Sequence, residues 1–140
     1  MDIQAGQYLT FRVARNDFAV DAAAVRAILP AHDLRPAVPS PSLYRFFGAW
    51  ICGFTTLRGQ EIPVIDLRSR LNLPHASFGR HPCIIVIENG PPESPRLAGF
   101  VADRVSQLIY ARDRDFSFGK LYRGGKPRRI LDPALLSANP

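Results

Sequence analysis

The sequence has 140 residues, 46% of them hydrophobic and 21% charged, and a formal net charge of +6 at neutral pH. A chain of this length forms one domain, or two very small interlocked ones, and buries roughly two-thirds of its unfolded surface. No run approaches the ~18 apolar residues of a membrane span, and the N-terminus shows no secretory signal. We therefore expect a cytoplasmic protein in which Cys52 and Cys83 are reduced core thiols.

The N-terminal residues predict a pair of strands. Leu9, Phe11 and Val13 alternate with less apolar positions, which is typical of a half-buried strand. Residues 15–17 supply a turn, and residues 18–20 predict the returning strand.

Two segments of the chain resemble each other. Residues 18–28 have the sequence FAVDAAAVRAI and residues 100–108 have the sequence FVADRVSQL, each after a strand and a turn. The first segment could hold a short helix capped by Asp21 and ended by Pro30, but the second is too short for one. We predict in both a strand, a corner marked by Asp21 or Asp103, and a second strand, so that the chain forms two related small barrels.

Residues 53–71, GFTTLRGQEIPVIDLRSRL, form the most informative segment. The pattern predicts a β-hairpin with Arg58 and Gly59 in its tight turn, followed by one or two helical turns capped by Asp66. Pro63 removes an amide donor from the second strand, which favours an edge position or a bulge. Because an arginine at a hairpin tip has little packing to do, we expect Arg58 to face a partner.

The C-terminal half continues the strand pattern. Residues 83–87 form a continuous apolar run, which predicts a strand covered on both faces. Residues 120–129 concentrate basic side chains and contain no acid. This segment is either a solvated loop or a contact site for an acidic protein or nucleic acid. Asp132 and Pro133 predict a last helical turn. Thirteen prolines, ten glycines and many short strands favour an all-β barrel or sandwich.

The sequence offers little that could carry catalysis. The three histidines lie in separate proline-flanked loops, without metal-ligand spacing. Asp66 and Asp103 each follow an apolar strand, where a carboxylate accepts from free backbone amides. A phosphate-binding loop at residues 120–127 fails, because Lys120 stands where glycine is required and Pro127 where serine or threonine should bind metal. We expect no enzymatic activity, cofactor, metal or small-molecule substrate.

Four ordered blocks make the sequence similar to the CheW family, the adaptors of bacterial chemotaxis. The similarity runs from about residue 8 to residue 136. The blocks are LRG (57–59) with PVIDL (63–67) after Gly53, FAVD (18–21) with Val25 and Ile28, GFV (99–101) with Asp103 and Val105, and ILDPALL (130–136). The structural residues of these motifs are Gly53, Gly59, Asp66 and Asp103.

This resemblance implies two intertwined SH3-like five-stranded barrels with short helical turns, in a single domain over residues 1–140. It also implies a scaffold that binds a chemoreceptor's cytoplasmic helical hairpin between the barrels and the regulatory domain of a CheA-like histidine kinase at the barrel ends. An amphipathic hairpin tip needs an apolar groove with polar anchors at its rim. The resemblance gives Val25, Ile28 and Phe54 as groove residues and Arg58 as the rim anchor. The alternatives are core packing for Val25 and Ile28, and an intramolecular bond for Arg58.

Two features depart from the family pattern. Ala27 stands where the family usually carries an acid, two residues after the valine of the first corner. The chain also has additional residues before Gly53, including Phe46, Phe47 and Trp50, which either cap a barrel core or form an exposed patch that contacts a partner or a second copy of the chain.

Three functions remain in view. The first is a scaffold coupling chemoreceptors to a CheA-like kinase, located in the cytoplasm at membrane-associated receptor arrays. The second is a CheW-like adaptor of a kinase pathway other than chemotaxis, favoured by Ala27 and the aromatic insertion. The third is a basic β-barrel that binds nucleic acid through residues 120–129. The third function is disfavoured, since exposed aromatic residues do not alternate with the basic residues of this segment along one strand.

Overall fold

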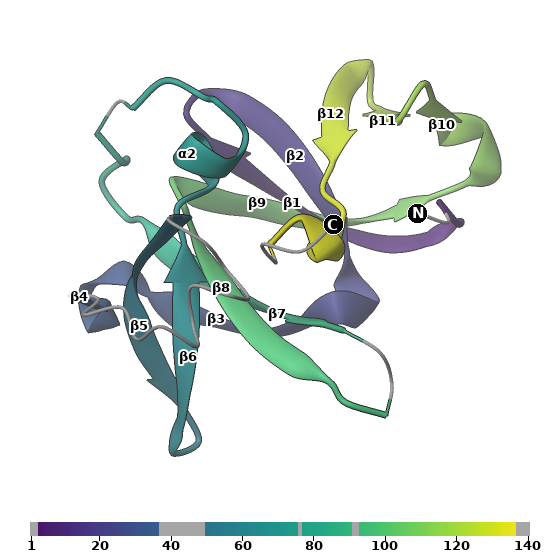
Figure 1. Ribbon diagram of the computed structural model, residues 1–140. Helices are drawn as coiled ribbons and strands as arrows, with labels where there is room; N and C mark the ends of the chain where they lie inside the picture. The colour runs from purple at the N-terminus through teal and green to yellow at the C-terminus, as the bar shows by residue number, and fades with distance from the viewer. Residues whose placement is uncertain (1–2, 37–49, 76, 91–92, 137–140) are drawn as a thin grey trace.

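The computed structural model describes residues 3–36, 50–75, 77–90 and 93–136, which form two β-sheets (Figure 1). The first sheet contains β1 (Gly6–Val13), β2 (Asn16–Asp21), β9 (Arg104–Ala111), β10 (Phe116–Ser117), β11 (Lys120–Arg123) and β12 (Lys126–Ile130). The second contains β3 (Val25–Pro30), β4 (Arg35–Pro36), β5 (Ile51–Leu57), β6 (Gln60–Ile65), β7 (Cys83–Asn89) and β8 (Arg96–Ala102). The all-β, two-barrel fold expected from the sequence is confirmed.

The two sheets have the same strand pattern. Their orders are β10-β11-β12-β2-β1-β9 and β4-β5-β6-β8-β7-β3, each with a central antiparallel hairpin, β1–β2 or β7–β8. In each sheet one parallel strand, β12 or β6, flanks this hairpin. Because β4 and β10 have only two residues each, both sheets have five longer strands. This correspondence confirms the internal repeat.

The sheets exchange strands at the two predicted corners. After β2 the chain leaves the first sheet, and β3 pairs with β7 of the second. After β8 it leaves the second sheet, and β9 pairs with β1 of the first. Each corner is a strand, an aspartate and a second strand, as predicted, with the 3-10 turn η1 (Ala22–Ala24) at the first. The barrels are therefore intertwined. The second sheet includes β3, which follows the hairpin of the first sheet, and the first sheet includes β9, which follows the hairpin of the second.

The apolar residues form three clusters. The largest lies between the two sheets, where the Phe11 ring centroid is 5.4 Å from that of Phe18 and 5.0 Å from that of Phe100. The first sheet has its own cluster around Leu121, and the second has one around Ile84. Each central hairpin is thus covered on both faces. One face packs against the shared cluster, and the other packs against the cluster of its own barrel.

This packing corrects one prediction and confirms another. The first strand is not half-buried, since Tyr8 and Thr10 are only 3% and 1% exposed. Tyr8 belongs to the first barrel's own cluster. The Thr10 hydroxyl bonds to the backbone of Gln107 beside a register shift in the β1–β9 ladder. The apolar run of residues 83–87 is buried on both faces, as predicted.

The strand that contains Pro63 is not at a sheet edge. β6 lies between β5 and β8, and Pro63 faces Phe54 in the antiparallel ladder. Pairing with β8 is limited to Val64 and Ile65, one step beyond the proline. The missing amide proton of Pro63 therefore removes no bond from that ladder.

Aspartates begin the short helices, as predicted. Asp66 caps α2 (Leu67–Arg70), and Asp132 accepts a hydrogen bond of 3.0 Å from the amide of Ala134 in η5 (Pro133–Leu136). The remaining 3-10 turns are η2 (Ala31–Asp33) and η4 (Asp113–Asp115). Among the described residues, no helix is long and apolar enough to cross a membrane.

Gly53 is required by a close approach of two backbones. It is buried in β5, where it faces Pro36 of β4. A Cβ atom at this position would lie 2.3 Å from the carbonyl oxygen of Arg35 and 2.7 Å from Cδ1 of Leu34. Since a backbone oxygen cannot rotate away as a side chain can, β4 would have to move.

We therefore expect Gly53→Ala to lower the free energy of unfolding by about 3 kcal/mol, at the upper end of overpacking costs. The measurement is urea denaturation followed by circular dichroism. Cys52→Ala is the control, because Cys52 is exposed on the same strand and should change stability by less than about 0.5 kcal/mol. Equal stability of the two variants would contradict the assignment.

Candidate functional site

The hairpin formed by β5 and β6 projects from the second sheet and carries Arg58 at its tip (Figure 1). Leu57 pairs with Gln60, so the connection has only two residues. Both have left-handed backbone, with φ of 51° at Arg58 and 78° at Gly59. This is the geometry of a type I′ turn, in which asparagine or glycine is favoured over arginine at the first position. The prediction of a tight Arg58–Gly59 turn is confirmed.

Arg58 lies beside a cleft of about 400 Å³ between β3, β7, β8 and the hairpin tip. Leu57, Leu97 and Pro95 supply apolar lining, and Gln60 is at its edge. The Arg58 side chain is exposed and makes no hydrogen bond or ion pair with any described residue. The intramolecular brace considered as an alternative therefore has no support in the described structure.

Arg26 and Glu88 form an ion pair in the same cleft. Arg26 also donates a hydrogen bond of 2.7 Å to the carbonyl of Ala23. Its charge is thus compensated by Glu88, whereas that of Arg58 is not. The arrangement is an apolar surface with one free cation at its rim, suited to an apolar segment that carries a carboxylate or a carbonyl group.

Val25 and Ile28 share one face of β3. Ala27 and Leu29 pack against the second barrel's own cluster, so Ile28 between them points to the opposite face. A register shift between Val25 and Ala27 places Val25 on that opposite face too, where it is partly buried against the shared cluster. Ile28 is 48% exposed and lines a separate concavity with Pro30 and Cys83.

The structure does not place the four predicted groove residues in one cavity. Of the four, only Arg58 lines the cleft at the hairpin tip. Phe54 is 8% exposed and therefore offers little surface to a partner. Ala27, where the family usually has an acid, packs inward against the second barrel's cluster rather than on the Ile28 face. The sequence carries no local signal for Arg26, Glu88 or Leu97, because these residues come from three different strands.

The aromatic insertion is only partly described. Phe46 and Phe47 lie outside the described residues. Trp50 is partly buried against the shared cluster, and the Arg70 guanidinium lies 4.4 Å from the centre of its ring. The carbonyl of Trp50 accepts a hydrogen bond of 2.8 Å from the amide of Asp66. Trp50 thus contributes to the junction between β5 and α2.

Asp66 organises this junction. Its Oδ1 accepts hydrogen bonds of 3.0 Å from both the amide and Nε of Arg68, and Oδ2 accepts from Nη2 at 3.2 Å. Burial alone would raise the pKa of Asp66, but hydrogen bonds and charge from Arg68 outweigh it and hold the pKa below its usual value. The Arg68 guanidinium also lies 3.9 Å from the ring centre of Phe78. This network is structural, as predicted for a corner aspartate.

Cys52 differs from the prediction of a core thiol. It is exposed, because the β5–β6 register shifts between Ile51 and Gly53 and turns this residue outward. Desolvation by the surrounding protein, with a contribution from the Asp66 carboxylate, raises the pKa of Cys52 to about 11. Both cysteines are free thiols, and burial also raises the pKa of Cys83.

Asp103 stabilises the second corner. Its Oδ2 accepts a hydrogen bond of 2.8 Å from the amide of Ala14, and Oδ1 accepts one of 3.0 Å from the amide of Gly79. One carboxylate thereby joins the β1–β2 turn to the loop before β7. Within the described ranges, no three His, Cys, Asp or Glu side chains are grouped as metal ligands.

The basic segment of residues 120–129 is a β-hairpin, β11–β12, rather than a solvated loop. Arg128 is 9% exposed and donates to the carbonyl of Arg123 at 3.2 Å. Lys126 forms an ion pair of 3.3 Å with Asp17, and the Arg129 guanidinium lies 5.9 Å from the Phe18 ring centre. Three of its five cations are thus engaged within the protein, which weakens the nucleic-acid interpretation.

The family model for the CheW-like domain matches residues 7–131, nearly the whole chain. The chain belongs to the CheW-like family. Among curated proteins it is 31% identical over 109 residues to the chemotaxis protein CheW of Rhizobium meliloti, covering 78% of this chain and 63% of that protein. The CheW of Bacillus subtilis is 30% identical over 115 residues, covering 81% of this chain and 67% of that protein.

The CheW fold is also found in a solved structure. The crystal structure of the scaffolding protein TtCheW from Thermoanaerobacter tengcongensis aligns with a TM-score of 0.73 and 20% identity, over 92% of this chain and 90% of that one. At this identity the match shows the shared fold. The chain spans 63% of the length of the Rhizobium CheW, so the activity of the whole relative is not transferred by the match.

The lowered pKa of Asp66 predicts a pH-dependent contribution to stability. A carboxyl whose pKa falls on folding stabilises the protein above its unfolded value, here the usual 3.8, and loses this effect as the pH falls through the folded value. We expect Asp66→Asn to lower the free energy of unfolding by about 2 kcal/mol at pH 7, because the charge-assisted pair with Arg68 is lost while the asparagine oxygen keeps the helix cap.

The difference in the free energy of unfolding between Asp66→Asn and the wild type should shrink as the pH is lowered below 3.8. Urea denaturation at pH 7 and pH 3 measures this difference. Asp113→Asn is the matched control, because Asp113 is exposed and its carboxylate accepts no hydrogen bond in the described structure. A deficit for Asp66→Asn that does not depend on pH would contradict the ionic contribution.

Proposed function

We propose that this chain is a non-catalytic signalling scaffold that couples a chemoreceptor-type helical hairpin to a CheA-like histidine kinase. Membership of the CheW-like family supports the proposal. The observation that carries it is the uncompensated Arg58 at the rim of an apolar cleft. Its place of action would be membrane-associated receptor arrays in the cytoplasm.

The receptor-binding part of the proposal rests on Arg58, Ile28 and Val25. An amphipathic hairpin presents apolar side chains at helical spacing, with polar groups at their margin. The exposed Ile28 and the partly buried Val25 offer an apolar face on β3, and Arg58 offers five donors for a carboxylate or carbonyl groups. A single contact of this kind has modest affinity, and the overall affinity rises when several modules bind together in an array.

The kinase-binding part rests on exposed apolar side chains of the first barrel. Leu108 and Tyr110 on β9 are 54% and 57% exposed, and Phe118 in the β10–β11 turn is 99% exposed. Phe118 also has a left-handed backbone with φ of 50°, which is unfavourable for an aromatic residue. An exposed ring on strained backbone gains nothing within the chain, so we assign it to a contact with the kinase's regulatory domain.

A CheW-like adaptor of a different kinase pathway remains the second candidate. It is favoured by Ala27, since the carboxylate that the family usually places there is missing. Binding to a CheA-like kinase regulatory domain and to a chemoreceptor fragment, both from the same genome, distinguishes the two. Binding of the kinase without any chemoreceptor favours the second candidate.

Arg58→Glu should weaken binding of a chemoreceptor hairpin fragment by about tenfold or more, since a favourable charge becomes a repulsive one. Titration calorimetry measures the affinity, and the thermal midpoint should stay within about 2 °C because Arg58 has no described partner. Arg114→Glu, the same change at an exposed arginine of η4, should bind as the wild type. An unaltered affinity of Arg58→Glu would remove Arg58 from the proposed site.

Arg58→Asn separates binding from folding more sharply. Asparagine followed by glycine is favoured in a type I′ turn, so this variant should be more stable than the wild type by about 0.5 kcal/mol. It should nevertheless bind the hairpin fragment more weakly, since the guanidinium is lost. Reduced stability together with weaker binding would indicate that Arg58 supports the hairpin instead.

Phe118→Asn tests the kinase contact by the same reasoning, because Gly119 follows with φ of 75°. We expect about tenfold weaker binding of the kinase regulatory domain, with stability unchanged or slightly raised. Binding of the receptor fragment should be unaffected. Wild-type affinity for the kinase domain would exclude Phe118 from that interface.

A further inference from the structure

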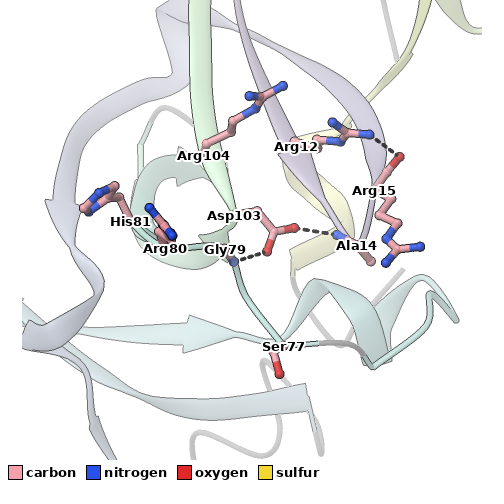
Figure 2. Close-up of a pocket in the computed structure, with 9 residues that line it drawn as sticks. All are labelled: Arg12, Ala14, Arg15, Ser77, Gly79, Arg80, His81, Asp103 and Arg104. Atoms are coloured by element: carbon pink, nitrogen blue, oxygen red, sulfur yellow. Dashed lines mark hydrogen bonds between the residues drawn. The ribbon is translucent and has the colours of Figure 1, made fainter.

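A second concavity, of about 520 Å³, lies where three distant segments meet (Figure 2). They are the β1–β2 turn, the corner between β8 and β9, and the loop of residues 77–81 that precedes β7. This concavity shares no lining residue with the Arg58 cleft. Four arginines and one histidine line it, with Asp103 as its single acid.

Two of these arginines are forced together by the sheet. Arg12 of β1 and Arg104 of β9 are direct partners in the antiparallel ladder. Figure 2 shows their side chains side by side above the corner. Like charges directly opposite each other destabilise a strand pair. Arg15, at the exposed tip of the β1–β2 turn, and Arg80 add two further cations.

Asp103 is the single acid among four arginines and forms no ion pair with any of them in the described structure. Both of its oxygens already accept backbone hydrogen bonds, from Ala14 at 2.8 Å and from Gly79 at 3.0 Å. Figure 2 shows these two bonds at the base of the concavity. Among the described residues, no acid forms an ion pair with any of the four arginines.

Arg12 also has an unused donor. Its Nε is buried and has no hydrogen-bond partner among the described residues. Its Nη2 contacts only the carbonyl of Arg15, at the long distance of 3.5 Å. A buried polar atom without a partner is costly, and rotation of this guanidinium toward an anion in the concavity would let it donate there.

We propose that the concavity binds an acidic segment of a partner protein, with Asp or Glu carboxylates held between Arg12 and Arg104. Planar guanidinium groups bind carboxylates with two parallel hydrogen bonds. Arg15 and Arg80 attract the neighbouring acids of the same segment from the rim. The like-charge pair of β1 and β9, unfavourable in the free protein, is compensated only when the segment is bound.

Carboxylates fit this site better than a small phosphate compound. Arginine side chains bind both carboxylates and phosphates, but sites that enclose a small phosphate compound commonly add free backbone amides of a nest or a helix N-terminus. Here the amides of Ala14 and Gly79 are already bound to Asp103, so the site offers only side-chain donors. A wide concavity of about 520 Å³ suits several residues of an extended peptide.

The test uses the full chain and a fluorescently labelled oligoglutamate peptide of about six residues, followed by fluorescence polarisation at low salt. We expect Arg12→Gln combined with Arg104→Gln to weaken binding by about tenfold or more. The control, Arg114→Gln combined with Arg123→Gln, removes the same charge from exposed arginines outside the concavity. Equal loss in both variants would overturn the proposal, because it indicates only non-specific attraction.

A second variant keeps the strands unchanged. Arg15→Gln combined with Arg80→Gln alters only exposed rim residues and should weaken peptide binding to a smaller extent than the first pair. We expect the wild-type thermal midpoint for Arg15→Gln with Arg80→Gln, and an equal or higher midpoint for Arg12→Gln with Arg104→Gln, since the like-charge pair is removed. Peptide binding as tight as the wild type's in both pocket variants would overturn the proposal.

A parallel titration with sodium pyrophosphate distinguishes the ligand class. We expect pyrophosphate to displace the labelled peptide only weakly, and equally from the wild type and the control. Pyrophosphate binding that is tighter than peptide binding, and is lost in Arg12→Gln with Arg104→Gln, would replace the acidic-peptide site by a phosphate site. Because no receptor or kinase fragment is used, this outcome is independent of the Arg58 site.

Discussion

The fold depends on the hydrophobic cluster shared by the two sheets. Each sheet is completed by a strand that follows the hairpin of the other sheet, β3 in the second sheet and β9 in the first. The aromatic rings of Phe11, Phe18 and Phe100 lie together between the two central hairpins. Burial of this cluster, the dominant favourable term in folding, therefore stabilises both barrels at once. We expect the two to unfold as one cooperative unit, since separation would expose the central hairpins of both.

The crossings between the sheets are made by charged corners rather than by apolar contacts. Where strands leave a sheet, backbone amides lose their ladder partners, and an aspartate supplies a compact acceptor. Asp103 accepts hydrogen bonds from backbone amides of two segments far apart in sequence. Asp66 accepts one from the amide of Arg68 and thereby caps α2. Asp66 also pairs with its neighbouring cation, Arg68, whereas Asp103 forms no ion pair with the four arginines of the concavity beside it.

The cations of the surface thus divide into two groups. Arg26, Lys126 and Arg128 are engaged with acids or carbonyls of the chain itself. Arg58 at one hairpin tip and the four arginines beside Asp103 form no ion pair in the described structure, and of these Arg12 alone has a side-chain hydrogen bond there, the long one to the carbonyl of Arg15. For the proposed scaffold the second group is the informative one, because its exposed and partly exposed guanidinium groups are hydrated in the free protein and available to a partner's acids. Two such places, without a shared lining residue, are consistent with a protein that holds more than one partner.

The sequence alone determined the all-β class, the internal repeat, the Arg58–Gly59 turn and the aspartate caps, because these follow from local periodicity and turn chemistry. It predicted a half-buried first strand wrongly, and of the two positions that it offered for Pro63, an edge or a bulge, the edge is wrong while a register shift does lie nearby in the β5–β6 ladder. It also could not anticipate that Arg12 faces Arg104, or that a bulge in β3 is what brings Val25 and Ile28 to one face. Cross-strand register and a bulge decide those neighbours. Only the tertiary structure fixes them, because strand pairing between residues about ninety positions apart leaves no period in the sequence.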